Sequence, residues 1–65
     1  MSQSERIRVG DRVKILQPDY VAERMGVVVS PEELPGGQTT GRWIIQVDAE
    51  DILLSLTPQE FEVLS

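Results

Sequence analysis

Few side chains in this sequence could take part in catalysis or metal binding, and three of them are carboxylates that lie close together in the chain. Asp48, Glu50 and Asp51 form an acidic cluster. Carboxylate oxygens suit hard cations such as Ca²⁺, and paired carboxylates also serve as general acids and bases. The spacing of a helix–loop–helix calcium site is absent, and acidic residues are common in hairpin turns. We therefore interpret the cluster as a turn and expect no metal site.

The sequence contains neither Cys nor His. Thiolate-bound zinc, iron–sulfur clusters and covalent thiol catalysis are thereby excluded, and the usual general base at neutral pH is missing. The glycine pair in Pro35–Gly37 lacks the lysine and the strand–loop–helix context of a phosphate-binding loop, so it is interpreted as a tight turn. We expect no catalytic residues and no cofactor, and an enzyme is the least favoured class.

Basic side chains gather at the start of the chain. Residues 1–14 hold four basic and two acidic side chains, a balance of +2, whereas residues 15–65 hold two basic and nine acidic ones, a balance of −7. Three interpretations are open: a solvated strand face, a docking patch for an acidic protein, or a nucleic-acid site. The net charge of −5 argues against the last. The cluster consists of Arg6, Arg8, Arg12 and Lys14.

Two aromatic residues are further candidates for contacts. Trp43 stands at the start of an apolar alternation, so it either fills the core or anchors a partner. Tyr20 stands in a loop beside Pro18, where its phenol either packs beneath the loop or offers the amphipathic contact that interfaces use. Arg42 precedes Trp43, so the two side chains point to opposite faces of the strand.

The length of 65 residues predicts one small domain. A chain of this size buries only about 60% of the surface that it exposes when unfolded, which leaves no room for a deep cleft. We expect a flexible N-terminus at residues 1–6 and one barrel over residues 7–65. No apolar run is long enough to span a bilayer, so we expect a protein that is either soluble or held at a membrane only through a partner.

Frequent Gly and Pro residues divide the chain into short β-branched segments, which predicts an all-β domain. The alternation over 12–17 predicts a half-buried strand. Thr57 and Pro58 are an N-cap and a first helical position, so they predict a single helical or 3₁₀ turn before the last strand. The predicted strands cover residues 12–17, 26–30, 42–47, 52–56 and 61–64, with polar loops over 17–24 and 31–41.

Five strands with a 3₁₀ turn before the last predict a small SH3-like antiparallel barrel. Closing such a sheet would protect its edges. The apolar positions of the five strands supply the predicted core, which consists of Val9, Val13, Ile15, Val27, Val29, Ile45, Val47, Ile52, Leu54, Phe61 and Val63.

Several segments carry a resemblance to known families. Val9–Ile15, with the sequence VGDRVKI, resembles the opening of many SH3-like barrels, including KOW domains. Gln17–Tyr20 and Met25–Val28 are similar to the first loop and second strand of the PsaE subunit of photosystem I. Three further segments resemble the NdhS family, which is the small SH3-like subunit of the photosynthetic NAD(P)H dehydrogenase-like complex. These segments are Leu34–Gly37, Gly41–Val47 and Leu54–Phe61. Together the resemblance covers residues 7–64.

The resemblance to NdhS implies a non-catalytic subunit on the hydrophilic arm of the NDH complex. Such a subunit helps reduced ferredoxin dock, so that electrons pass through iron–sulfur subunits to plastoquinone in cyclic electron transport around photosystem I. It implies a peripheral place on the cytoplasmic side of a cyanobacterial thylakoid membrane, with membrane contact only through the complex. Arm subunits and ferredoxin are the expected partners, nucleic acid is not, and the isolated chain is expected to be a monomer.

Ferredoxins are acidic, as this chain is, so a direct contact would rely on a local basic patch or on neighbouring subunits. The predicted partner-binding residues are Arg12, Lys14, Tyr20, Arg24 and Arg42. Two alternatives stay open: a PsaE-like or ferredoxin–thioredoxin-reductase-like accessory subunit, and a KOW-like RNA- or ribosome-binding module.

Overall fold

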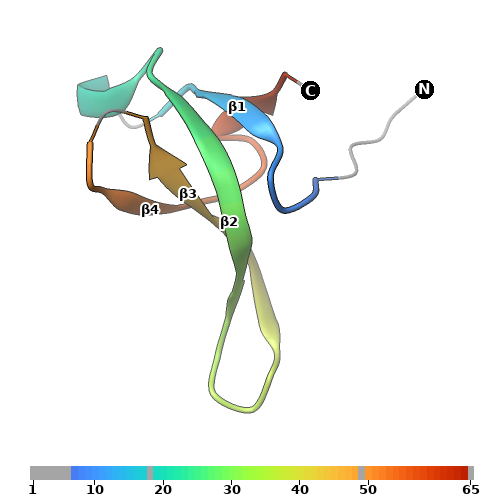
Figure 1. Cartoon of the computed structure of the whole chain (residues 1–65). Coiled ribbons are helices and arrows are strands. Elements are labelled where there is room, and N and C mark those ends of the chain that lie inside the picture. The colour runs from blue at the N-terminus through green and yellow to red at the C-terminus, as the bar shows by residue number, and fades with distance from the viewer. Residues whose placement is uncertain (1–6, 18, 49, 65) are drawn as a thin grey trace.

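The chain folds into one five-stranded antiparallel sheet (Figure 1). The computed structural model describes residues 7–17, 19–48 and 50–64, so the predicted flexible segment 1–6 lies outside the described residues. The sheet order is β4-β3-β2-β1-β5, which places the last strand beside the first. The elements are β1 (Arg12–Ile15), the 3₁₀ helix η1 (Asp19–Val21), β2 (Met25–Glu33), β3 (Thr39–Val47), β4 (Leu53–Leu56) and β5 (Phe61–Val63).

This strand order confirms the predicted all-β class, a small SH3-like antiparallel barrel. The predicted turn before the last strand is also present: the Glu60 amide donates to the Thr57 carbonyl oxygen at 2.9 Å. The Glu60 carboxylate in turn accepts the Thr57 amide at 2.8 Å, which is the contact that the acidic residue makes in a capping box. The 3₁₀ helix η1 lies in the segment 17–24, which the sequence predicted as a loop.

The core is apolar throughout and lies inside the curled sheet. Its members are eight nearly inaccessible side chains, Val13, Ile15, Val21, Val28, Ile45, Val47, Leu56 and Phe61. Five of them belong to the predicted core. The predicted members Ile52 and Leu54 are only partly buried and pack against this cluster. Trp43 packs against it in the same way and thus helps to fill the core.

Several core predictions were wrong, and β2 shows why. In the run of three valines over 27–29, the sequence does not show which side chains point into the core, because adjacent residues point to opposite faces and all three are apolar. The pairing of Val13 with Gly26 settles it and turns Val28 inward, so Val27 is half-buried and Val29 is exposed. Two other predicted members, Val9 and Val63, are also exposed, by 64% and 36%.

The β2–β3 hairpin is longer than predicted and projects away from the rest of the sheet (Figure 1). The loop expected over 31–41 shrinks to 34–38, because β2 runs to Glu33 and β3 starts at Thr39. The register of the two strands shifts near Pro31, and proline is tolerated at such irregularities. The turn is closed by a bond of 2.7 Å from the Leu34 amide to the Gln38 carbonyl oxygen.

Candidate protein-docking surfaces

In the predicted basic patch on β1, Arg12 forms an ion pair with a distant acidic residue and Lys14 does not. Arg12 is exposed, and its Nη2 atom lies 2.8 Å from Oδ2 of Asp48. Lys14 is half-buried on the same outer face and stands opposite Glu62 in the pairing of β1 with β5. Among the described residues, Lys14 makes no ion pair within 4 Å. Arg6, the first member of the basic cluster, lies outside the described residues.

Arg24 repeats this arrangement next to η1. Its guanidinium forms an ion pair with the carboxylate of Glu50. The segment 48–51, predicted as an acidic turn, therefore binds two of the predicted partner-binding arginines. Exposed pairs of this kind stabilise a protein by no more than about 1 kcal/mol. Their main consequence is electrostatic, because carboxylates at short range offset the positive charges of Arg12 and Arg24.

Arg42 lies with a different set of groups, so the structure does not bring the four predicted arginine and lysine side chains into one patch. Its Nη1 atom donates to the Ser55 carbonyl oxygen at 3.0 Å and lies 3.9 Å from Oε1 of Glu60. Arg42 thereby joins β3 to the outer edge of β4 and to the turn before β5. This contact gives the side chain a structural task within the molecule.

Tyr20 is available for contacts. It stands on η1 with 74% of its surface exposed, so the interpretation that its phenol packs beneath the loop is wrong. Its neighbour Val21 is the residue of η1 that enters the core. A three-residue 3₁₀ helix has side chains on every side, and the apolar one is buried while the amphipathic one faces solvent.

Large apolar side chains are exposed over much of the surface. Eight such residues are exposed among the described residues, and where they adjoin, contiguous apolar surface often marks interaction sites. Leu34, half exposed at the tip of the β2–β3 hairpin, was missed because it directly precedes Pro35–Gly37 in a segment that was predicted as a polar loop. The full set is Val9, Leu16, Tyr20, Val29, Leu34, Leu53, Val63 and Leu64.

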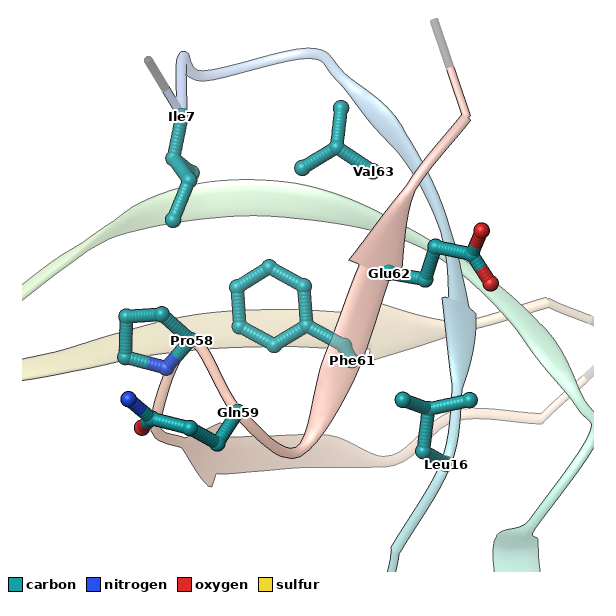
Figure 2. Close-up of a pocket in the computed structure, with 7 residues that line it drawn as sticks. All are labelled: Ile7, Leu16, Pro58, Gln59, Phe61, Glu62 and Val63. Carbon is teal, nitrogen blue, oxygen red and sulfur yellow. The ribbon is translucent and has the colours of Figure 1, made fainter. Parts of the chain in front are cut away.

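An open groove of about 490 Å³ runs beside β5. Figure 2 shows the Phe61 ring on one side of the strand, near Ile7 and Pro58, with Leu16 and Glu62 on the other side. The remaining lining residues are Gln59 and Val63. Sequence reasoning missed this groove, because its walls come from both ends of the chain.

Comparisons with protein-family models, with curated proteins and with solved structures gave no match. The described part of the chain has no helix with the length and apolar character needed to cross a membrane. Within the same residues, no group of three acidic, Cys or His side chains is arranged to hold a metal ion.

Proposed function

We propose that this chain is a non-catalytic docking subunit of the NdhS type in a photosynthetic NAD(P)H/ferredoxin–plastoquinone oxidoreductase complex. Its task is to help reduced ferredoxin dock during cyclic electron transport around photosystem I. The observation that carries the proposal is the exposure of eight large apolar side chains on one small barrel, since such a surface suits assembly with other subunits. The family resemblance over residues 7–64 supplies the identity of the host complex.

In this proposal the apolar positions bind the hydrophilic arm of the complex. Leu34 at the hairpin tip is the most suitable anchor, because the hairpin extends beyond the body of the sheet (Figure 1). The chain holds no cofactor in this role and lies on the cytoplasmic side of the thylakoid membrane, bound there only through the complex.

The charges of the molecule define how it acts on ferredoxin. The described residues include five basic and ten acidic side chains, and Arg12 and Arg24 are paired with carboxylates. A distant acidic protein is therefore attracted mainly by neighbouring subunits. At contact distance Lys14 and the exposed parts of Arg12 and Arg24 bind acidic side chains and orient the partner.

The host complex is identified by purification of the tagged chain from cyanobacterial thylakoids. We expect co-purification of hydrophilic-arm subunits of the NDH complex, and loss of those subunits in a Leu34→Asp variant that stays folded. Thr39→Asp is the control, because Thr39 is exposed on the same hairpin but is not one of the eight apolar positions. Recovery of photosystem I, of ferredoxin–thioredoxin reductase or of ribosomal proteins would replace the proposal by the corresponding alternative.

The docking role is tested kinetically in the assembled complex. We expect the double variant Arg12→Glu with Lys14→Glu to slow ferredoxin-dependent plastoquinone reduction at low ionic strength, and the difference from the wild type to shrink as salt screens the charges. Thr39→Glu on the exposed part of the hairpin controls for added negative charge. Unchanged kinetics at low ionic strength would remove this patch from the docking site.

A further inference from the structure

β5 is an edge strand with an open hydrogen-bonding side. The Leu64 amide donates to the Arg12 carbonyl oxygen at 2.8 Å and the Leu16 amide to that of Glu60 at 2.9 Å. In an antiparallel pair, bonded and non-bonded positions alternate, so the backbone of Glu62 also turns toward β1. The N–H and C=O groups of Phe61 and Val63 therefore point to the outer edge, where no other described strand pairs with β5.

The opposite edge of the sheet is protected, which makes the open edge of β5 a distinct feature. On β4 the same alternation turns the backbone of Ser55 outward, and its carbonyl oxygen accepts a bond from the Arg42 guanidinium. A charged side chain laid over an edge is a common protection against strand addition. No described side chain donates to or accepts from the outer backbone groups of β5.

The surroundings of β5 define the chemistry of an added strand. The groove beside it offers the apolar walls of Ile7, Pro58 and Phe61 (Figure 2). Between Phe61 and Val63 stands the exposed carboxylate of Glu62. Lys14 lies opposite it on β1, but the two side chains form no ion pair within 4 Å, so the carboxylate stays available on the outer side of β5. In a sheet, opposite charges that face each other across two strands attract.

We propose that the β5 edge binds an extended segment of a partner protein as a sixth strand, in which a Lys or Arg opposite Glu62 is flanked by apolar residues. The partner backbone pairs with Phe61 and Val63, and its apolar side chains enter the groove. Main-chain bonds then supply affinity and the alternating side chains supply specificity, as in other strand-addition sites. This surface goes beyond the proposed function, because it does not involve ferredoxin or depend on the host complex.

A second copy of this chain is a poorer occupant. Two β5 strands paired antiparallel about a twofold axis would place Glu62 directly opposite Glu62 of the other copy, at a non-bonded position where side chains are closest. Like charges in that position destabilise a pair. The acidic net charge of −5 adds a general repulsion between copies.

The test is a titration of the isotope-labelled full chain with a capped seven-residue peptide of alternating valine and lysine, followed by amide NMR shifts and hydrogen exchange. We expect the amides of Phe61 and Val63 to shift and to become protected. A valine–glutamate peptide should bind about 5-fold more weakly. Glu62→Lys should reverse this preference, whereas Glu33→Lys on the hairpin should leave it unchanged.

A backbone variant separates pairing from unspecific apolar contact. Val63→Pro removes an outward N–H, which an edge strand tolerates, so we expect a folded chain that no longer binds the peptide. Shifts that spread over the surface without protection at β5, or equal binding of both peptides, would overturn the proposal. So would binding that appears only after deletion of residues 1–6, because the chain's own N-terminus would then be the occupant. None of these results bears on the purification test of the host complex.

Discussion

Arg42 shows how one side chain can be read as a partner contact in the sequence and serve a different purpose in the fold. Its guanidinium bonds the Ser55 carbonyl oxygen and approaches the Glu60 carboxylate. These contacts connect β3, the outer edge of β4 and the turn that leads into β5. Because hydrogen bonds that involve a charged group are stronger than neutral ones, Arg42 contributes to stability by joining these three elements.

We expect Arg42→Ala to lower the free energy of unfolding by about 1 kcal/mol, a modest value because the side chain is nearly half exposed. Urea denaturation followed by circular dichroism measures the change. Arg8→Ala is the matched control, since it removes the same charge from an exposed position without a side-chain bond among the described residues. An equal effect of the two substitutions would show that the contacts of Arg42 contribute nothing beyond its charge.

A second residue-scale feature is the backbone of Glu23. Its φ of 69° lies in the left-handed region, which costs a residue with a Cβ atom about 1–2 kcal/mol. The conformation is imposed by the loop, in which the Glu23 amide donates to the Ile15 carbonyl oxygen at 2.7 Å.

Glu23→Gly should therefore raise the free energy of unfolding by about 0.5 kcal/mol, the relief of strain less the added entropy of glycine in the unfolded chain. Thermal and urea unfolding both report it. Glu33→Gly in β2 should act in the opposite direction, because glycine weakens a strand. Loss of stability in the Glu23 variant would contradict this account of the loop.

At the scale of elements, β2 leaves no room for a side chain at Gly26, where it passes close to β3. A Cβ atom on that residue would lie 2.7 Å from the Gln46 carbonyl oxygen and 2.9 Å from Cγ2 of Ile45. Both neighbours belong to β3, and Ile45 is fully buried. The missing side chain therefore allows β2 to pass over the core at this point.

Gly26→Ala should lower the free energy of unfolding by about 2 kcal/mol, because overpacking against backbone cannot be relieved by a change of rotamer. Chemical denaturation gives the value, and an NMR spectrum of the folded variant should show shifts at Ile45 and Gln46. Ser30→Ala in the same strand serves as a control and should change stability by less than about 0.5 kcal/mol. An unchanged free energy of unfolding in the Gly26→Ala variant would mean that the two strands separate easily here.

At the scale of the whole molecule, the sheet curls into a barrel but keeps two ends, β4 and β5. The first end is covered by Arg42, and the second presents Glu62 between apolar neighbours. Charged residues on edge strands prevent self-association in many β proteins. The isolated chain is accordingly expected to be monomeric.

Glu62→Val should turn β5 into a continuous apolar edge strand and produce concentration-dependent dimers. Sedimentation velocity measures the dimer fraction at neutral pH. Glu33→Val removes the same charge from the hairpin and should leave the chain monomeric. Dimers of the wild type, or a monomeric Glu62 variant at millimolar concentration, would contradict the protective role of this carboxylate.

Local patterns were sufficient for the strands, for the turn before β5 and for the fold class. The alternation at Val13 and Ile15 depends only on residues that are close in the chain. The same is true of the capping residues Thr57 and Pro58, so both patterns can be recognised without the tertiary structure. Strand lengths in the β2–β3 hairpin were underestimated, because a ribbon that projects from the body has no apolar face and resembles a loop.

What the amino-acid sequence determined by itself is the class of molecule: a small all-β domain whose strands and turns follow from side-chain periodicity and from Gly and Pro positions. What only the tertiary structure decided is which surface is available. It paired Arg12 and Arg24 with acids from 48–51, turned Val28 rather than its neighbours inward, and placed Glu62 on an open edge. The physical reason is that charge pairing, burial phase and edge exposure depend on contacts between residues far apart in the chain, about which local patterns carry no information.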